Sequence, residues 1–344
     1  MVAERTGVRQ RPPMDLASLM RLAELTDVIV PMTARAVSDL GIADLLADGP
    51  RPVAELAAES GAHERSLCRA LRALAAKGIF TEPEPEVFAL TPLAQPLRSD
   101  HPMSMRAVYT LLASDVQAWA ELPHSLRTGE AAFDRAHGTD YWSHLADNPQ
   151  ESRRVDRWMH AITRLHLRTV LPCHPWGELA HVVDVGGGDG GFLAGLLGRY
   201  PAMRGTLLDL PHVVAAADRV LTEAGVRDRC AIVPGSFFDE LPGGADAYLL
   251  KTVLPGFDDD QVVAVLRRVR EAMRPDSRLL LLEAVLPPGD TFDVAKLYDV
   301  HTLVLTGGTH RTAEETAVLL ERAGLRLDTV RPTATLTILA ATPA

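Results

Sequence analysis

The sequence predicts an α/β protein whose second half forms a doubly wound, mostly parallel sheet behind an N-terminal all-helical, winged-helix region. Three observations predict this fold class. From residue 181 onwards, short apolar runs alternate with helical patterns, as in parallel sheets with crossover helices. A glycine-rich turn follows the first apolar run, and a carboxylate ends the second. Residues 16–46 instead carry apolar side chains at three- and four-residue spacing, which indicates helices.

The second half of the chain contains enough elements for a complete sheet. We expect strands at residues 181–185, 205–209, 230–233, 246–250, 278–284 and 327–340, the last divided into a hairpin. Helical patterns cover residues 190–200, 211–225, 260–274 and 313–323. Ligands of open parallel sheets bind at the carboxyl ends of the strands, so Asp184, Asp209 and the 234–237 turn mark the expected site.

Composition and charge exclude several classes of protein. The net charge of −10 disfavours nucleic acid or another polyanion as the partner. Residues 1–13 are polar, and no apolar run is long enough to cross a bilayer, so we expect neither secretion nor a membrane span. Cys68, Cys173 and Cys230 lack metal-site or disulfide spacing. We therefore expect a cytoplasmic protein without a metal site.

The glycine-rich turn predicts a nucleoside-bearing cofactor. Residues 184–191 read Asp-Val-Gly-Gly-Gly-Asp-Gly-Gly, and the next strand ends at Asp209. Glycines let the backbone approach a bulky ligand, and Asp209 can accept hydrogen bonds from ribose hydroxyls. Gly186, Gly188 and Gly191 also match the dinucleotide pattern, so the glycines alone do not identify the cofactor. Asp184, in a loop without basic residues, would repel a pyrophosphate and favours the sulfonium of S-adenosylmethionine.

Six segments occur in the order and spacing of one known family. They are residues 184–191, Leu-Asp-Leu-Pro-His-Val at 208–213, Gly-Ser-Phe-Phe at 235–238, Ala-Asp-Ala-Tyr-Leu-Leu-Lys at 245–251, Leu-Val-Leu-Thr-Gly-Gly at 303–308, and Arg-Thr at 311–312. Over residues 15–342 the chain resembles the class I S-adenosylmethionine-dependent O-methyltransferases, both the plant caffeate/flavonoid type and the actinobacterial antibiotic-tailoring type. The resemblance implies methylation of a hydroxyl on an aromatic or polyketide-type small molecule of secondary metabolism, with S-adenosylhomocysteine as the other product.

The resemblance also implies a domain organisation. We expect a disordered tail at 1–14, a winged-helix-like dimerisation domain at 15–100, a helical linker region at 101–172 that contributes to the substrate pocket, and a Rossmann-like catalytic domain at 173–344. A homodimer would form through the N-terminal helices, since an apolar helical stripe at a chain terminus needs something to bury it. The remaining expected partner is a small aromatic acceptor, with no nucleic acid and no membrane.

The cofactor residues of the family map onto this sequence with few changes. By resemblance, Gly186 lies under the methionine part, Asp209 binds the ribose hydroxyls, and Lys251 lies near the methionine end. Ser236 stands where many relatives place an aspartate near the adenine amino group, and Phe237 would cover the adenine face. The full predicted set is Asp184, Gly186, Gly188, Asp209, Leu210, Ser236, Phe237 and Lys251.

The catalytic residues depart from the family pattern. Residues 254–259 read Leu-Pro-Gly-Phe-Asp-Asp, so Pro255 stands where the family has a catalytic histidine. Proline can neither accept a proton nor hydrogen-bond through its side chain. Of the two acids that orient that histidine in the family, Glu283 is retained, whereas the other is replaced by His310 in Gly-Gly-Thr-His-Arg-Thr. The site is therefore rebuilt.

Three accounts of the rebuilt site remain open. In the first, His310 or His301 acts as the base, paired with Glu283. In the second, orientation alone suffices, since it can supply roughly 7–11 kcal/mol of the barrier against about 3–5 kcal/mol from a general base. In the third, the fold binds the cofactor but performs other chemistry, such as hydroxylation, decarboxylation or cyclisation.

The acceptor pocket is expected between the helical region and the sheet. By resemblance, residues 133–145 and 155–164 contribute to it. Its expected wall residues are Trp142, Met159, His160 and Leu305, with His301 beside them. A wall with so little charge would suit an aromatic acceptor.

Residues 53–90 also permit a different interpretation, a DNA-binding regulator. Two helical patterns at 53–61 and 65–77, followed by short apolar runs, are typical of a winged helix, and Arg65, Arg69 and Arg72 share the second helix. Six acidic residues surround this unit, namely Glu55, Glu59, Glu64, Glu82, Glu84 and Glu86. Because the basic surface of a DNA reader is missing, we expect a scaffold with a solvated or ion-paired arginine face.

Overall fold

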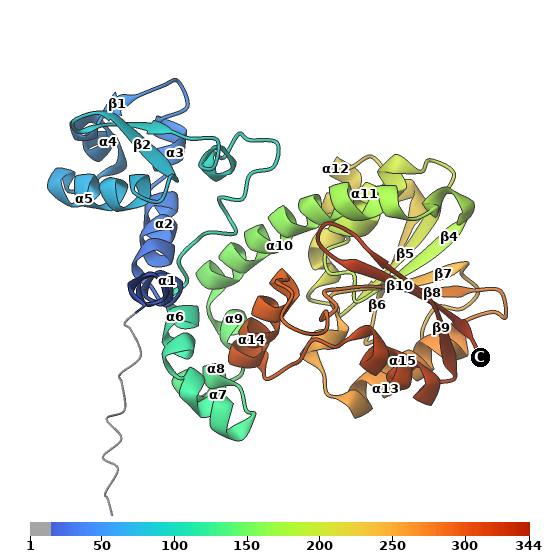
Figure 1. The fold of residues 1–344 in the computed structure, drawn as a ribbon. Coiled ribbons are helices and arrows are strands. Elements are labelled where there is room, and N and C mark those ends of the chain that lie inside the picture. Colours follow the sequence, from blue (N-terminus) through green and yellow to red (C-terminus); the bar gives the residue numbers. More distant parts are fainter. Residues whose placement is uncertain (1–14) are drawn as a thin grey trace, which may run out of the picture. The chain divides into compact units, whose positions relative to one another are not determined.

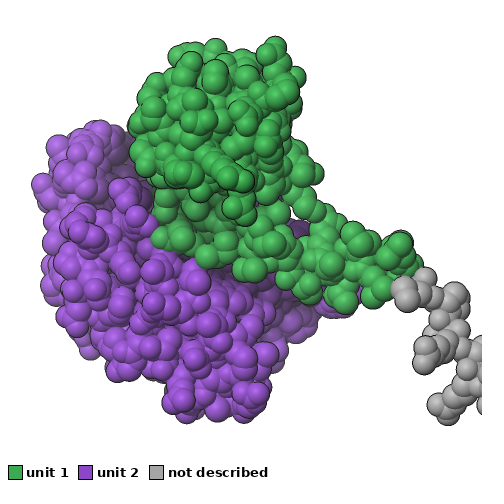
Figure 2. All heavy atoms as spheres, turned by 90° about the vertical axis from the view of Figure 1, so that its left-hand side faces the viewer, with its two compact units in different colours: residues 1–111 green, residues 112–344 purple. Residues whose placement is uncertain are grey.

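The computed structural model describes residues 15–344 (Figure 1). The expected disordered tail at 1–14 lies outside the described residues. The chain divides into two compact units at Leu111, shown in different colours in Figure 2. Each unit is described by itself below. The domain boundaries expected at residues 100 and 172 stay predictions.

The first unit contains a winged helix, as the sequence predicts. It begins with α1 (Leu16–Leu25), α2 (Ile29–Asp39) and α3 (Ile42–Leu45). The winged helix follows as β1 (Arg51–Pro52), α4 (Val53–Ser60), α5 (Glu64–Ala75), β2 (Phe80–Glu84) and β3 (Val87–Leu90), with η1 (Gln95–Leu97) after it. The three strands pair in the order β1-β3-β2.

Helix α5 shows how this unit is stabilised. Leu67, Leu71 and Leu74 recur at three- and four-residue spacing and are buried in the core of the unit. On the other side of the helix, Arg72 forms a salt bridge of 2.9 Å with Glu82. This arginine is therefore ion-paired within the unit, as expected for a scaffold.

The second unit opens with helices. They are α6 (Ala113–Ala120), α7 (Leu122–Thr128), α8 (Ala132–His137), α9 (Tyr141–Asp147) and α10 (Pro149–Val170), followed by η2 (Leu171–Cys173) and η3 (Trp176–Glu178). Pro149 begins the 22-residue α10, at a position where proline needs no amide hydrogen. The later helix α14 (Val294–Thr306) packs against α6 and α8 around Phe133. Residues near 133 and near 305 thus share one small core.

A seven-stranded, mostly parallel sheet forms the centre of the second unit. Its strands are β4 (His181–Val185), β5 (Arg204–Asp209), β6 (Cys230–Pro234), β7 (Ala247–Lys251), β8 (Arg278–Glu283), β9 (Leu325–Pro332) and β10 (Thr337–Pro343). Their order is β6-β5-β4-β7-β8-β10-β9, and only β10 runs antiparallel to its neighbours. The predicted fold class is confirmed, and each predicted strand lies within a few residues of the observed one.

Helices cover both faces of the sheet (Figure 1). One face packs on α11 (Gly191–Arg199) and α12 (Ala217–Glu223), the other on α13 (Asp259–Ala272) and α15 (Ala313–Arg322). Successive side chains of a strand point to opposite faces of the sheet, so Val182 packs in the core on the first face and Val183 in the core on the second. Capping boxes begin α13 at Asp258 and α15 at Thr312. Short 3₁₀ turns complete the unit: η4 (Val214–Ala216), η5 (Arg227–Arg229) and η6 (Leu254–Gly256).

Helix α14 is the one long helix of the second half that the sequence interpretation omitted. Its end signals are present, because Asp293 caps the first turn and Gly307 ends the helix with a φ of 69°. Across residues 15–344, no helix is both long and apolar enough to span a membrane.

Candidate active site

The glycine-rich turn between β4 and α11 forms a cradle at the carboxyl end of the sheet. The amide of Gly186 donates to the carbonyl oxygen of Leu208 over 2.8 Å, which fixes the turn to β5. Gly186 has a φ of 70°, and a Cβ there would lie 2.9 Å from Cγ2 of Val253. Gly188 has a φ of 66° but faces open space. The turn is thus tightly packed at Gly186 and open to a ligand at Gly188.

Asp209, at the end of β5, holds this turn from the other side. Its Oδ2 accepts a hydrogen bond from the Gly188 amide over 2.8 Å, and its Oδ1 accepts from the Leu210 amide over 2.7 Å. Burial raises the pKa of Asp209, while the two amides lower it. A carboxylate offers about four acceptor positions, so two remain for the hydroxyl groups of a ligand.

A buried carboxylate lies directly beneath the turn. Asp184 is 1% exposed, and neither of its carboxylate oxygens has a hydrogen-bond partner among the described residues. A Cβ on Gly187 would lie 2.6 Å from Oδ2 of Asp184, which places the carboxylate against the turn. Burial raises the pKa of Asp184 to about 7, while the charge of Lys251 lowers it. This carboxyl group is unsatisfied without a ligand.

Lys251, at the end of β7, is the cation of this region. Burial lowers the pKa of its amine, and the charges of Asp184, Glu283 and Asp189 raise it. An orphaned carboxylate, a strand-end carboxylate and an open glycine turn suit a ligand that carries both hydroxyl groups and positive charge. The described residues therefore fit S-adenosylmethionine.

An aromatic cluster borders the same turn. Phe237 lies edge-on to Phe257, with ring centroids 5.6 Å apart, and packs within 3.4 Å of a Cβ built on Gly186. The Ser236 hydroxyl accepts from the Phe238 amide over 3.2 Å, which leaves its own hydrogen available to an acceptor. Both predicted adenine-side residues thus lie beside the cradle, in the turn after β6.

Glu283, at the end of β8, binds the segment that carries Pro255. Its Oε1 accepts from the amides of Val253 and Leu254 over 3.2 and 3.4 Å, while Oε2 has no hydrogen-bond partner among the described residues. Burial raises the pKa of Glu283 to about 8, although the two amides and Lys251 lower it. A carboxyl group that is protonated at neutral pH is a poor base for a phenol.

His310 has both ring nitrogens engaged. Nδ1 lies 3.1 Å from the carbonyl oxygen of Ala284, and Nε2 lies 3.2 Å from the hydroxyl oxygen of Thr302. A carbonyl only accepts, so Nδ1 carries the hydrogen and Nε2 accepts from the Thr302 hydroxyl. Burial lowers the pKa of His310, although the hydrogen bond to Ala284 raises it. The lowered pKa favours the neutral ring, and its two contacts link the end of β8 to α14.

The residues expected to surround the acceptor fall into two groups. His301 stacks on Trp119, with ring centroids 6.0 Å apart, and Leu305 is buried in the small core around Phe133. Trp142 and Met159 are instead exposed, at 66% and 41%. The described unit thus brings His301 and Leu305 together on α14 but does not enclose Trp142 or Met159.

Two residues without an assigned role lie at the cofactor side. Asp189, inside the glycine turn, hydrogen-bonds the ring of His160, and this bond raises the pKa of that histidine although burial lowers it. His166 is 7% exposed, and its Nδ1 has no hydrogen-bond partner among the described residues. Burial, with the charge of Lys251, lowers the pKa of His166 to about 3. The sequence could have identified Asp189, because it lies between two glycines of the turn, whereas nothing in the sequence distinguishes His166 from other helical residues.

No group of three or more His, Cys, Asp or Glu side chains within residues 15–344 is arranged to hold a metal ion.

The chain matches two families of known domains. An O-methyltransferase dimerisation domain matches residues 23–100, and an O-methyltransferase domain matches residues 119–326. The phenazine O-methyltransferase PhzM of Lysobacter antibioticus is 40% identical over 330 residues, which cover 95% of this chain and 96% of that protein.

Two further relatives bear on the chemistry. The crystal structure of NcsB1, an O-methyltransferase from neocarzinostatin biosynthesis, contains S-adenosylmethionine and 2-hydroxy-5-methyl naphthoic acid. It is 36% identical, with a TM-score of 0.81 over 94% of this chain and 98% of that chain. The aclacinomycin 10-hydroxylase RdmB of Streptomyces purpurascens is 32% identical over 324 residues, covering 92% of this chain and 87% of that protein.

These matches confirm the predicted resemblance, the class I methyltransferase fold and S-adenosylmethionine as the cofactor. They do not test the roles expected for individual site residues, which stay predictions. With the cradle, the two carboxylates and the matched domains together, this chain belongs to the O-methyltransferase family.

Proposed function

We propose that this O-methyltransferase methylates an acidic hydroxyl group of an aromatic or polyketide-type small molecule, and that no side chain of the protein acts as the base. One observation carries the proposal. Pro255 stands at the family's base position, while His310, which replaces an acid of the family, has both ring nitrogens engaged. The remaining acid, Glu283, is bound to the backbone beside Pro255.

The cofactor half of the site is the better supported half. We assign Asp209 to the ribose hydroxyls, with Leu210 beside it, and Gly186 and Gly188 to the cradle. Asp184 and Lys251 would hold the charged methionine end, and Ser236 and Phe237 the adenine. When bound, S-adenosylmethionine supplies an electrophilic methyl group on a sulfonium. The role of the chain is to hold that group in a fixed place and to exclude water from it.

The acceptor half rests on α9, α10 and α14. We assign Trp142, Met159, His160 and Leu305 to its wall, with His301 at its edge. The assignment is supported by the apolar side chains among these residues, namely Trp142, Met159 and Leu305. It is also supported by two relatives: PhzM is named for a phenazine, and the NcsB1 structure holds a naphthoic acid. An aromatic acceptor would be held by its ring faces rather than by charge.

An acidic acceptor can be methylated without a general base, because less free energy is needed to ionise its hydroxyl group. A general base typically contributes about 10²–10⁴-fold. An ordinary phenol has a pKa of about 10, and each unit by which a neighbouring carbonyl lowers it changes the free energy of ionisation by about 1.4 kcal/mol. A hydroxyl with a pKa near about 7 is already partly ionised at neutral pH, so orientation alone can complete the reaction.

The proposal is tested by pH profiles of kcat/KM for a set of hydroxylated aromatic acceptors whose pKa values span about 6 to 10. Formation of S-adenosylhomocysteine and of the methyl ether are both measured. We expect the inflection of each profile to follow the pKa of the acceptor. His310→Gln and His301→Gln variants should show the same inflections.

A profile that inflects at one pH for every acceptor would overturn the proposal. If His310→Gln or His301→Gln removed that inflection, the base would be the corresponding histidine, which is the first of the accounts considered for the sequence.

A second candidate function uses the same site for chemistry other than methyl transfer, namely hydroxylation, decarboxylation or cyclisation. It is favoured by one observation, since RdmB, a relative over most of the chain, is named a hydroxylase. The two functions differ in their products. Conversion of an acceptor without S-adenosylhomocysteine formation would support this candidate, and stoichiometric formation would exclude it.

We also propose that the protein is a homodimer assembled through α1 and α2. The match to a dimerisation domain supports it. So does a row of large apolar side chains that are exposed in the single chain: Leu16, Leu19, Met20, Leu22, Leu25, Val28 and Ile29. Light scattering on the full chain should give twice the mass of one chain, and Leu19→Glu with Leu22→Glu should give a monomer.

A further inference from the structure

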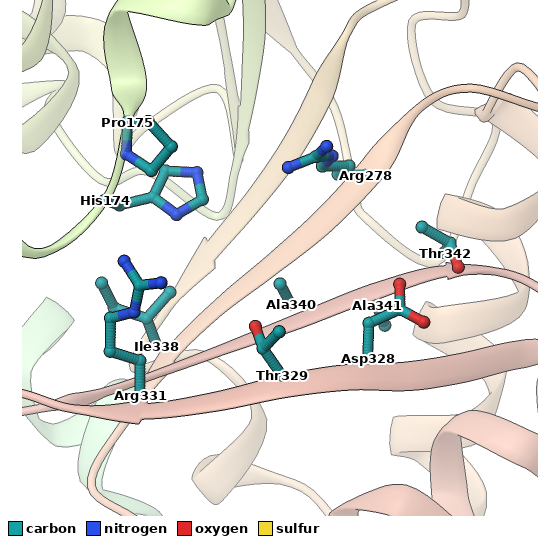
Figure 3. A pocket seen from close by; sticks show the side chains of 10 residues that line it. All are labelled: His174, Pro175, Arg278, Asp328, Thr329, Arg331, Ile338, Ala340, Ala341 and Thr342. Carbon is teal, nitrogen blue, oxygen red and sulfur yellow. The ribbon is translucent and has the colours of Figure 1, made fainter.

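A pocket of about 260 Å³ lies on the second unit, away from the cofactor residues (Figure 3). Arg278, at the amino end of β8, borders it, whereas the cofactor residues lie at the carboxyl ends of the parallel strands. Its floor is formed by Ile338 and Ala340 of β10. The segment before β4 contributes His174 and Pro175. None of these residues belongs to the site described above.

A β-bulge gives the pocket its shape. Thr329 of β9 pairs with Ala340, but Leu327 pairs with Ala341, so Asp328 is an extra residue in β9. Because the bulge interrupts the alternation of side chains, Asp328 and Thr329 both line the pocket. The side chains of Ala340 and Ala341 are small, which leaves room in the pocket for a ligand.

The charged groups that line the pocket are two guanidinium groups and one carboxylate. The guanidinium group of Arg278 has neither a salt bridge nor a hydrogen bond among the described residues. Within residues 15–344, the guanidinium group of Arg331 donates only to the carbonyl oxygen of Cys173, over 2.6 Å. The one carboxylate in the lining, Asp328, is bound by Arg326 over 3.0 Å. In Figure 3 both guanidinium groups reach toward the ring of His174.

The ring of His174 lies in the same pocket lining as the two guanidinium groups. Burial lowers the pKa of His174, and Arg331 and Arg278 lower it further, against the opposing charge of Glu178. Two guanidinium groups against one carboxylate thus leave the lining with a net positive charge, in a chain with a net charge of −10. Such a place attracts an anion.

We propose that this pocket binds a small organic carboxylate, with its oxyanion between Arg278 and Arg331 and its apolar part on Ile338 and Ala340. Guanidinium groups match carboxylates in geometry and bind them through paired N–H groups. Pockets for drug-sized ligands span roughly 300–1,000 Å³, so the smaller volume here suits a single-ring compound. The inference is independent of the proposed function, because the pocket shares no residue with the catalytic region.

The test uses benzoate as the probe and benzyl alcohol as its neutral analogue. Binding to the full-length protein, saturated with S-adenosylhomocysteine, is measured by calorimetry at constant ionic strength. The test variant is Arg278→Gln with Arg331→Gln. The matched control is Arg204→Gln, which changes an exposed arginine at the amino end of β5 that does not line the pocket.

We expect benzoate to saturate a site whose affinity the double variant lowers at least about tenfold, which corresponds to about 1.4 kcal/mol, because the variant removes both charge-assisted contacts. Arg204→Gln should bind benzoate like the wild type, and benzyl alcohol should bind more weakly than benzoate. All variants should retain methyl transfer. Equal benzoate affinity in the double variant and the wild type would overturn the proposal, because benzoate would then occupy another site. Absence of saturable binding, or equal affinity for benzyl alcohol, would overturn it as well.

Discussion

The carbonyl oxygen of Pro255 accepts a hydrogen bond from the amide of Thr309 over 2.9 Å. The two segments that depart from the family pattern are therefore joined through their backbones. Arg311 strengthens the connection, since its Nη2 donates to the carbonyl oxygen of Phe257 over 2.9 Å. The two departures that the resemblance implies therefore lie in segments that contact each other.

Gly308 makes this close approach possible. A Cβ at position 308 would lie 2.0 Å from the carbonyl oxygen of Pro255, and that backbone atom cannot rotate away. We expect Gly308→Ala to reduce the free energy of unfolding by about 2–4 kcal/mol and to abolish turnover. Denaturant unfolding of the purified variant measures the loss.

The matched control is Gly198→Ala in α11, where a Cβ would meet nothing within 4 Å. This variant should be unchanged or more stable by about 0.5–1 kcal/mol, because alanine favours a helix. Equal stability of the two variants would show that the segments do not approach as closely as described.

Pro255→His should restore a base to the rebuilt site. Position 255 lies in η6, next to the amides that Glu283 binds, so a histidine there would have an acid beside it. We expect kcat/KM to rise at least about tenfold for a phenol of ordinary pKa. It should change little for an acceptor that is already ionised.

Pro255→Ala is the control, because it removes the ring without adding a base, and it should give no gain. Methyl transfer to both acceptors is followed in parallel at neutral pH. A folded, cofactor-binding Pro255→His enzyme without any gain for the weakly acidic phenol would place the acceptor oxygen away from residue 255.

Glu283 should make stability depend on pH. Burial raises the pKa of its carboxyl from 4.5 to about 8, so the folded chain keeps a proton that the unfolded chain releases between those values. Stability therefore falls as the pH rises through this window, and a glutamine removes the effect. We expect Glu283→Gln to gain about 1–3 kcal/mol over the wild type between about pH 5 and pH 8.

Urea unfolding at the two pH values measures this difference, with the exposed Glu240→Gln as the control, which should follow the wild type at both. Glutamine preserves the oxygen that accepts from Val253 and Leu254, so the comparison isolates the charge. A gain that does not change with pH would mean that Glu283 is ionised throughout.

The sequence predicted most of the fold because the relevant signals are local. Strands at the sheet centre are continuous apolar runs. Asp184 is the next-to-last residue of one strand and Asp209 is the last residue of the next, so the cofactor edge could be located without a structure. Helix α14 was missed although Asp293 and Gly307 mark its ends, because apolar side chains lie on its exposed face as well as on its buried face, which obscures the helical period.

The state of the catalytic residues could not be predicted in the same way. The engagement of His310 depends on Ala284 and Thr302, which lie 26 and 8 residues away in the chain. The orphaned nitrogen of His166 depends on burial between elements, which no local pattern encodes. Hydrogen-bond partners that are distant in sequence require the folded chain, whereas residue types at strand ends do not.

Asp209 provides the sharpest test of the cofactor site. Asp209→Ala removes the carboxylate that binds the Gly188 and Leu210 amides and is assigned to the ribose hydroxyls. Charge-assisted hydrogen bonds are worth about 1.5–3 kcal/mol each, so we expect S-adenosylhomocysteine to bind at least about 100-fold more weakly. Asp209→Asn retains one acceptor oxygen and should lose about tenfold. Calorimetry measures both, with the exposed Asp239→Ala as a control that should bind like the wild type. Unchanged affinity in a folded Asp209→Ala protein would place the ribose elsewhere.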